Sequence, residues 1–402
     1  MLIGDSYNPV PLQGVGIVEL VISRDTLLRA LQTIQGVVEN RSSAMPILQN
    51  VLIETEGKKN IRLLGTNLDI SMRGMFEAEV EKAGKVTLNA RKLFDIVREL
   101  PEAEVRFTEE DGQWIEMRCE RSKFRFPGLP PAEFPALPES KESDAHTISA
   151  SVLSEMIRKT MFAISQDETR YTYNGVYMET EADILRLVAT DGHRLAMIER
   201  PSEGLVLHEG VIVHKKALGE LVKLLQGVEG EVSVSLTHVS SGQGLSLSGD
   251  EASASLTPNH IIFQMENIAL SARLIDGEFP KYRQVIPDNN EHSILMNRES
   301  LTQALRRVAL FTNETRMVKF AFSPGQLKLT TNGSEAGEAE EIIESNAQTD
   351  ITIGFNSRYC LDALSILDEE QISMELKDSL SPGVLSPKDS DGYTYVVMPM
   401  RV

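Results

Sequence analysis

Three stretches of the chain repeat one pattern of apolar and polar positions: LNARKLFDIVREL at 88–100, VHKKALGELVKLL at 213–225 and FNSRYCLDALSIL at 355–367. Each begins as a strand end, continues through a polar turn, and then places apolar residues at helical spacing. A second set reads as helix starts with Ser, Thr or acidic residues in the first turn: SRDTLLRAL at 23–31, SASVLSEMI at 149–157 and NRESLTQAL at 297–305. The two sets predict helices over 23–34, 90–100, 149–162, 214–226, 297–308 and 356–368.

A third set is strand-like: IRLLGTN at 61–67, LRLVATD at 185–191 and LKLTTNG at 327–333. The three sets follow one another in the same order with nearly the same spacing, which predicts three copies of one folding unit. Proline-rich joints at 124–138 and 276–290 both contain Glu-Phe-Pro and mark the boundaries. We therefore predict an extension over 1–17 and domains over 18–142, 143–289 and 290–402. Each is expected to be an α+β unit with antiparallel sheets and two helices.

Composition agrees with several ordinary globular domains. A chain of 402 residues is too long for one core, and 41% of its residues are hydrophobic. The opening MLIGDSYNPVPLQGVGI lacks the basic start and apolar run of a secretory signal. Cys119 and Cys360 are too few for a disulfide framework. We therefore expect a cytoplasmic protein with no membrane partner.

The stretch LVATDGHRLA at 187–196 is the strongest candidate for chemistry. Asp191 and His193 could form the acid–base pair of a hydrolase, or the polar side chains could close a turn after a strand. A third interpretation is a ligand pocket to which Thr190, His193 and Arg194 contribute polar groups. No nucleophile elbow, zinc-protease motif or P-loop is present, GQGLSLSG at 242–249 is interpreted as a hairpin, and the histidines lack metal-ligand spacing. We expect no metal, no cofactor and no catalysis.

Charge is distributed unevenly between the predicted helices and the rest of the chain. The chain carries a net charge of −19, yet Lys and Arg outnumber Asp and Glu within the six helices. Basic residues lie at or near helix N-termini: Arg91, Lys92, Lys215, Lys216, Arg298 and Arg358. The helix dipole disfavours a cation there, whereas a helix N-terminus with nearby cations attracts phosphate. A solvated basic face is the alternative, but the basic excess summed over the six helices favours weak, sequence-independent binding of DNA.

Four segments carry a family resemblance: ATDGHRLA at 189–196, DGEFPKYRQVIP at 276–287, GFNSRYCLDAL at 354–364 and YVVMPMRV at 395–402. From about Val18 to Val402 the chain resembles the bacterial sliding clamps, the beta subunits of DNA polymerase III. The resemblance implies the DNA-clamp fold, in which the sheets lie outside and two helices of each domain face a central hole. It also implies a head-to-tail homodimer that closes into a ring around double-stranded DNA. Such a clamp is a processivity factor rather than an enzyme; it tethers the replicative polymerase and is loaded by a clamp loader.

The same resemblance implies a peptide-binding cleft between the second and third domains. Partner proteins would dock there through a short motif, roughly Gln followed by Leu and Phe. The residues carried over to this cleft are Tyr173, Thr190, Gly192, His193, Arg194, Leu195, Pro280, Val285, Asn356, Tyr359, Leu380, Val396, Val397, Met398, Pro399, Met400 and Arg401. Gln284 departs from the family pattern, because the best-known clamps carry arginine there. Near Met317, we cannot place the aromatic residue that some members contribute to the cleft.

Ring closure and DNA contact are predicted partly from charge. The basic segment CERSKFRF at 119–126 and the acidic segment EAGEAEEIIES at 335–345 are expected to be strand edges that meet between subunits. The candidate interface residues are Arg121, Lys123, Phe124, Arg125, Phe126, Leu310, Phe311, Glu338 and Glu340. For DNA, Arg41 and Gln166 are candidates by resemblance, and the charge pattern adds Arg91, Lys92, Arg170, Lys215, Lys216, Arg298 and Arg307. The competing hypotheses are the hydrolase and a peptide-binding scaffold that does not bind DNA.

Overall fold

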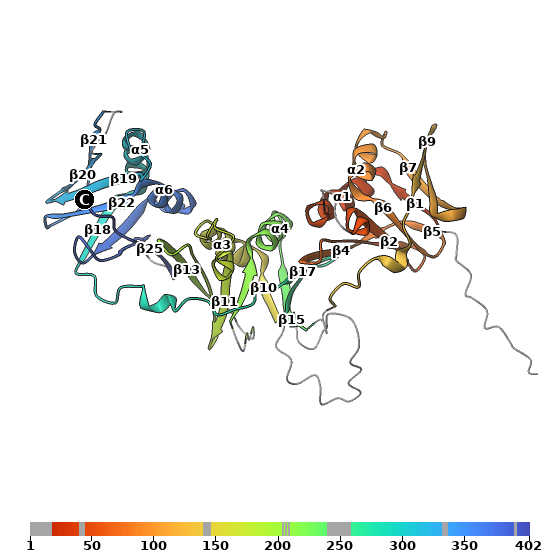
Figure 1. Ribbon diagram of the computed structural model, residues 1–402, viewed down its shortest axis with the longest axis horizontal. Helices are drawn as coiled ribbons and strands as arrows, with labels where there is room; N and C mark the ends of the chain where they lie inside the picture. Colours follow the sequence, from red (N-terminus) through yellow and green to blue (C-terminus); the bar gives the residue numbers. More distant parts are fainter. Residues whose placement is uncertain are drawn as a thin grey trace, which may run out of the picture. The chain divides into compact units, whose positions relative to one another are not determined.

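The computed structural model describes residues 18–39, 45–139, 146–202, 205, 207, 210–238, 259–331, 337–389 and 392–402 (Figure 1). The predicted extension at 1–17, the hairpin at 242–249 and Arg41 lie outside these residues. The chain divides into two compact units. Unit 1 comprises Met1–Glu139 and Ile262–Ser271, and unit 2 comprises Ser140–Ile261 and Ala272–Val402. Residues 262–271, which lie in the second predicted domain, thus belong to unit 1.

One order of elements occurs three times along the described chain, with one additional strand between the two helices of the first copy. The first copy contains β1 (Glu19–Ser23), α1 (Arg24–Ile34), β2 (Asn50–Glu56), β3 (Asn60–Thr66), β4 (Ile70–Glu77), β5 (Glu79–Lys82), β6 (Lys85–Asn89), α2 (Ala90–Glu99), β7 (Glu104–Glu110), β8 (Trp114–Cys119) and β9 (Ser122–Pro127). The second contains β10 (His146–Ser149), α3 (Ala150–Met161), β11 (Gly175–Glu181), β12 (Ile184–Thr190), β13 (Arg194–Pro201), β14 (Val211–His214), α4 (Lys215–Leu225), β15 (Glu231–Thr237), β16 (His260–Gln264) and β17 (Ile268–Arg273). The third contains β18 (His292–Asn297), α5 (Arg298–Ala309), β19 (Met317–Ser323), β20 (Gln326–Thr330), β21 (Glu340–Glu344), β22 (Ile351–Asn356), α6 (Ser357–Ile366), β23 (Gln371–Leu376), β24 (Gly383–Pro387) and β25 (Tyr393–Val397). The six predicted helices are confirmed, each within two residues of its expected bounds.

The strands form antiparallel sheets. In unit 1, one sheet has the strand order β5-β1-β7-β8-β9, and β4, β3, β2 and β6 follow one another in a second sheet. In unit 2, an eight-stranded sheet has the order β14-β11-β12-β13-β25-β24-β23-β18, and a four-stranded sheet has the order β21-β20-β19-β22. The pairing of β13 with β25 joins strands of the second and third copies into one sheet.

The helices pack on one another in pairs and bury one face against strands. Helix α1 contacts α2, α3 contacts α4, and α5 contacts α6. Helix α1 buries Leu27, Ala30, Leu31 and Ile34, whose spacing places them on one face. No helix within the described residues is long and apolar enough to cross a membrane.

Most helices begin at a side chain that accepts a backbone hydrogen bond. The N-cap residues Ser23, Asn89, Asn297 and Asn356 accept an N–H from the first turn of α1, α2, α5 and α6. His214 does the same for α4, because its Nδ1 accepts the Lys216 N–H at 3.1 Å. Ser149, before α3, makes no such bond. Such a cap satisfies a donor that has no partner inside the helix.

These caps predict a local difference in stability between two helices. We expect Asn89→Ala to lower the local free energy of unfolding of α2 by about 1 kcal/mol, because its side chain accepts the Lys92 N–H at 3.0 Å. Ser149→Ala is the control and should change α3 little. Native-state hydrogen exchange on the amides of the two helices measures both effects. Equal changes in the two helices would contradict this assignment.

Candidate functional site

The turn between β12 and β13 is closed by hydrogen bonds from its own side chains. The Thr190 hydroxyl donates to the carbonyl of Arg194 at 2.6 Å and accepts the Gly192 N–H at 3.1 Å. One carboxylate oxygen of Asp191 accepts the N–H of His193 at 2.9 Å and that of Arg194 at 3.1 Å. Gly192 has a φ of +89°, which glycine adopts without a steric penalty. The polar residues of this stretch therefore build a tight turn, as one of the three interpretations expects.

The corresponding turn in unit 1 has the same hydrogen bonds. The Thr66 hydroxyl donates to the carbonyl of Ile70 at 3.2 Å and accepts the Leu68 N–H at 3.0 Å. The side-chain oxygen of Asn67 accepts the Ile70 N–H at 2.8 Å. The turn is thus a property of the repeated unit. Any function peculiar to the second copy must come from the side chains that differ, above all from Arg194 at the position of Ile70.

Arg194 is buried and its guanidinium joins three elements. Nε donates to Asp191 at 3.0 Å, one terminal nitrogen donates to Asp362 of α6 at 2.6 Å, and the other donates to the carbonyl of Phe162 at 2.8 Å. The guanidinium carbon lies 4.6 Å from the centroid of the Tyr359 ring and 5.4 Å from that of Phe162. Arg194 therefore holds the turn, α6 and the end of α3 in one arrangement.

Asp191 does not orient the imidazole of His193. Its two carboxylate oxygens accept bonds from backbone N–H groups and from the Arg194 guanidinium. The His193 ring instead stacks beside Tyr359, with ring centroids 6.3 Å apart and an interplanar angle of 15°. This geometry lacks the carboxylate–imidazole contact on which the hydrolase hypothesis depends.

A second ionic contact connects α3 to the segment that follows α6. The ammonium of Lys159, a residue only 5% exposed, lies 2.9 Å from a carboxylate oxygen of Glu155 and 3.6 Å from one of Glu369. Glu155 also accepts a hydrogen bond from Arg200 at 2.9 Å. A buried cation with several carboxylate partners fixes geometry, because moving it would leave charge unpaired in a poorly solvated place.

The C-terminal strand lies directly against this turn. In the β13–β25 pair, Leu195 is opposite Val396. Beyond the strand, the Met398 N–H donates to the carbonyl of His193 at 2.9 Å, and the Met400 N–H donates to the carbonyl of Gly354 at 2.8 Å. Residues at the end of the sequence are therefore brought beside the turn of the second copy and the strand before α6.

The predicted cleft residues divide into a buried floor and an accessible rim. The floor residues, at most 7% exposed, are Thr190, Arg194, Leu195, Val396 and Val397. The half-buried residues are Tyr173, Pro280, Val285, Asn356, Tyr359, Met398, Pro399 and Met400. The exposed residues are Gly192, His193, Leu380 and Arg401. A hollow of about 300 Å³ adjoins this rim and is lined in part by Gln284, Val285, Lys377, Ser381 and Pro382.

The proline-rich joint that supplies Pro280 and Val285 packs on the inner strands β12, β13 and β25 of the eight-stranded sheet. Phe279 and Tyr282 are buried in one cluster with Val188, Leu195 and Val396. The Phe279 ring stacks on Tyr177 with centroids 4.8 Å apart and an interplanar angle of 6°. The joint is thus part of the core of unit 2 rather than a loose connection.

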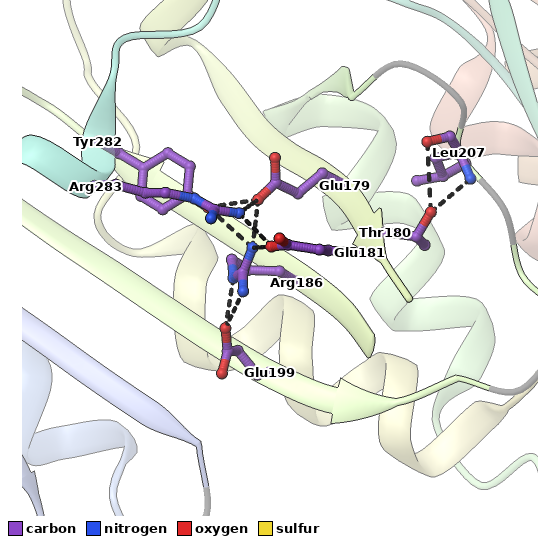
Figure 2. A network of polar contacts seen from close by, with 8 residues as sticks. All are labelled: Glu179, Thr180, Glu181, Arg186, Glu199, Leu207, Tyr282 and Arg283. Carbon is purple, nitrogen blue, oxygen red and sulfur yellow. Dashed lines mark hydrogen bonds and ion pairs between the residues drawn. The ribbon is translucent and has the colours of Figure 1, made fainter. Parts of the chain in front are cut away.

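A polar network also holds the same joint (Figure 2). One oxygen of Glu179 accepts hydrogen bonds from the Tyr282 hydroxyl, from Arg186 at 2.6 Å and from Arg283 at 3.0 Å. Arg283 also donates to Glu181 at 2.6 Å. Burial alone would raise the pKa of Glu179, but these hydrogen bonds outweigh it and lower the pKa to about 2.

Sequence reasoning did not single out this network. Its only signal was position: Arg186 occupies the same place in the repeated strand segment as Arg62 and Lys328. Those residues also form ion pairs in their own copies, Arg62 with Glu56 and Lys328 with Glu340. The sequence does not show that Arg186, unlike Arg62 and Lys328, would bond to a residue of a proline-rich joint.

The candidate interface residues lie at two sheet edges. Strand β9 is an outer strand of its sheet in unit 1, and β21 is an outer strand of its sheet in unit 2. Leu310 is 79% exposed and Phe311 is 37% exposed, whereas Phe126 is only 4% exposed. Arg121 and Glu338 are exposed and Phe124 is half-buried. The remaining charged members already have partners within the chain: Lys123 with Glu116, Arg125 with Glu110, and Glu340 with Lys328.

The candidate DNA contacts fall into two groups. Arg91, Lys92, Gln166, Arg170 and Lys216 are exposed, and Lys215 is half-buried. Arg298 donates to the carbonyl of Glu369 at 2.9 Å, and Arg307 donates two bonds to Glu341 at 2.6 and 2.9 Å. Both candidate arginines of α5, Arg298 and Arg307, therefore already have partners within the chain.

A threefold repeat of two helices among antiparallel strands defines the class of the DNA clamps. The domain models of the DNA polymerase III beta subunit match residues 18–138 for its N-terminal domain, 147–281 for its central domain and 283–401 for its C-terminal domain. The chain therefore belongs to the family of the DNA polymerase III beta subunit, the bacterial beta sliding clamps, as the resemblance implied. This family supplies the non-catalytic processivity factor of the polymerase.

Individual relatives are similar over almost the whole chain. The beta sliding clamp of Pseudomonas putida is 35% identical over 386 residues, which covers 95% of this chain and 99% of the relative. The crystal structure of the DNA polymerase III subunit beta from Pseudomonas aeruginosa has a TM-score of 0.86 at 34% identity. The crystal structure of a sliding clamp from Bartonella birtlesii bound to griselimycin has the same TM-score and identity. Both structures cover 96% of this chain, and the chain covers 100% of each.

Arg194 and Arg358 offer a matched test of whether the buried contacts of Arg194 stabilise unit 2. We expect Arg194→Met to lower the free energy of unfolding of unit 2 by about 3 kcal/mol, because the change leaves Asp191 and Asp362 without their buried cation. Arg358→Met removes a 58% exposed side chain that lies 3.9 Å from the same Asp362. It should cost less than about 0.5 kcal/mol. Differential scanning calorimetry compares the two variants. Equal losses in the free energy of unfolding would show that the buried contacts of Arg194 do not stabilise unit 2 more than an exposed ion pair does.

The pKa of Glu179 predicts how stability changes in acid. Because its folded-state pKa of about 2 lies below the ordinary value of 4.5, the ionised group stabilises the fold above about pH 4.5. That contribution is lost as the pH falls toward 2. We expect Glu179→Gln to lose less stability than the wild type between about pH 5 and about pH 3, measured as the change in urea midpoint. Glu278→Gln, at an exposed carboxylate of the same joint, is the control and should follow the wild type.

Proposed function

We propose that two copies of the chain close head to tail into a ring around double-stranded DNA and act as a sliding clamp for the replicative polymerase. The observation that carries this proposal is the match of all three beta-subunit domain models, in order, along one chain with a threefold repeat. In this proposal the domains are 18–142, 143–289 and 290–402, and the protein works in the cytoplasm. Two helices of each domain face the central hole.

The proposed closure pairs the outer strand β9 of one copy with the outer strand β21 of the other. Strand β9 is basic, with Lys123 and Arg125, and β21 reads EEIIE. Opposite charge selects which edges meet, and exposed backbone groups at the two edges complete each other's hydrogen bonds. Leu310 and Phe311 would add apolar area to that contact.

The proposed DNA contact is electrostatic and does not read sequence. Arg91, Lys92, Lys215 and Lys216 lie in the first turns of α2 and α4. Gln166 and Arg170 are exposed before the short turn Tyr171–Tyr173. Few contacts of this kind give weak binding, which suits a ring that is retained by topology and must move along the duplex.

The proposed docking site for partners is the surface over the turn at 190–194. Leu195 and Val396 form an apolar floor, and Val285, Met398 and Leu380 stand at its rim. Methionine side chains adapt to differently shaped partners, so one site can serve several proteins. The occupant would be a short peptide with Gln followed by Leu and Phe, from the polymerase, the clamp loader or another partner.

Retention on circular DNA tests the ring. We expect the clamp, loaded on a nicked circular plasmid by its clamp loader and ATP, to remain bound through gel filtration and to leave rapidly once the plasmid is linearised. Topological retention is the physical reason, since a ring can leave only over a free end. The amount of clamp that elutes with the plasmid before and after cutting is the measurement. Equal retention in both cases would contradict encirclement.

Leu310→Asp supplies the matched control for ring closure. The side chain is 79% exposed within one copy, so the change should not disturb the fold of unit 2. A buried carboxylate between two copies would disfavour their contact. Analytical ultracentrifugation should therefore find the 44.6 kDa protomer for the variant and twice that mass for the wild type. A wild-type monomer would exclude the ring.

A further inference from the structure

Tyr282, in the joint at 276–290, makes hydrogen bonds through both its side chain and its backbone. Its hydroxyl donates to Glu179 of β11, and its ring is buried with only 5% exposed. Its N–H donates to the carbonyl of Pro280 at 2.6 Å, and its carbonyl accepts the N–H of Val285 at 3.0 Å. Pro280 and Val285 are the two joint residues assigned to the docking cleft. Tyr282 therefore connects the polar network on the sheet directly to the backbone of the cleft wall.

Arg186 and Arg283 complete the attachment. Arg186 donates to Glu179 at 2.6 Å, to Glu181 at 3.3 Å and to the Tyr282 hydroxyl at 3.3 Å. Arg283 donates to the same hydroxyl at 3.2 Å and to Glu181 at 2.6 Å. Figure 2 shows the two guanidinium groups converging on the carboxylates. Since each carboxylate binds both arginines, movement of the joint would break several charge-assisted hydrogen bonds at once.

The chain contains its own comparison, because the first joint contains the same Glu-Phe-Pro sequence. Phe134 is buried at 8% exposure in unit 1, as Phe279 is at 7% in unit 2. Leu137 and Pro138, however, stand where the second joint has Tyr282 and Arg283. Neither Leu137 nor Pro138 can donate a side-chain hydrogen bond. The apolar anchor is thus shared by both joints, whereas the ionic attachment belongs to the joint that supplies the cleft.

We propose that Glu179, Tyr282 and Arg283 are positioning residues of the docking cleft, which fix the height of Pro280 and Val285 above its apolar floor. This inference rests on the proposed function, because it assumes that the cleft binds a peptide. The three side chains do not touch the peptide. They lower the entropy that the joint would lose on binding, so a ligand meets a wall that is already ordered.

The test measures binding of a fluorescein-labelled synthetic peptide that contains Gln followed by Leu and Phe. We expect Glu179→Gln to raise the dissociation constant about five- to tenfold, mainly through faster dissociation, and Tyr282→Phe about threefold. Tyr282→Phe keeps the buried ring, so it preserves the fold even if the first variant is unstable. The control is Glu56→Gln, which removes a carboxylate from the Arg62 ion pair in unit 1 and should leave peptide affinity unchanged.

Two further readouts separate positioning from general stability. Hydrogen exchange at Val285 should accelerate in Glu179→Gln without peptide, while exchange in α3 stays unchanged. In a double-mutant cycle, Glu179→Gln should cost less affinity in a Val285→Ala background than in the wild type, because the wall that it positions is already truncated. Two results would overturn the inference without contradicting the proposed docking cleft. One is that Glu179→Gln raises the dissociation constant by the same factor in the Val285→Ala background as in the wild type. The other is wild-type affinity in both Glu179→Gln and Tyr282→Phe. If the wild-type protein does not bind the peptide, the proposed cleft fails and this inference fails with it.

Discussion

The antiparallel pairing of β13 with β25 is the contact on which the rest of unit 2 depends. It makes one sheet from strands of the second and third copies and sets Leu195 opposite Val396. Because side chains alternate between the two faces of a strand, this register decides which apolar residues lie under the joint and which lie under the helices. A slip by one residue would turn Leu195 away from Phe279 and Tyr282. The floor of the proposed cleft and the seat of the joint are therefore set by the same ladder of hydrogen bonds.

The repeated turn shows how one fold element acquires different roles without changing its backbone. Thr66 and Thr190 make equivalent bonds, and Leu68 at φ +76° occupies the place of Gly192 at φ +89°. A leucine in the left-handed region of backbone conformation lowers the stability of the fold by about 1 kcal/mol, which the first copy tolerates. In the second copy the glycine removes the side chain from the turn, and the neighbouring Arg194 reaches α6. The backbone is thus inherited from the repeat, and the change of role lies in two side chains.

The sequence predicted the repeated architecture better than the roles of individual side chains. Helical spacing and polar first turns located the six α-helices of the described residues, because local periodicity decides those elements. The family resemblance located the stretch at 189–196, but it did not indicate that Arg194 would be buried between Asp191 and Asp362. No feature of the sequence around Arg194 indicates Asp362 as its partner, because their contact depends on long-range packing. The network around Glu179 escaped prediction for the same reason, as its partner Arg283 is distant in sequence.

The arginines at helix starts have a structural explanation that periodicity could not supply. Arg24 begins α1, yet its side chain donates to the carbonyls of Val97 and Arg98 at the end of α2. Arg298 begins α5 and donates in the same way to the carbonyls of Leu364 and Glu369, at and beyond the end of α6. A cation that is unfavourable at the N-terminus of its own helix is favourable at the C-terminus of the paired helix, where carbonyl groups lack partners.

The second copy has Ala150 at this position, so the arrangement belongs to the first and third copies. The phosphate-attracting interpretation of these cations therefore weakens for the first helix of each pair. The same interpretation still applies to the second helix of a pair, because Arg91 and Lys92 of α2 and Lys216 of α4 are exposed. Any electrostatic attraction for DNA would then come mainly from α2 and α4, while Arg24 of α1 and Arg298 of α5 connect each helix to its partner.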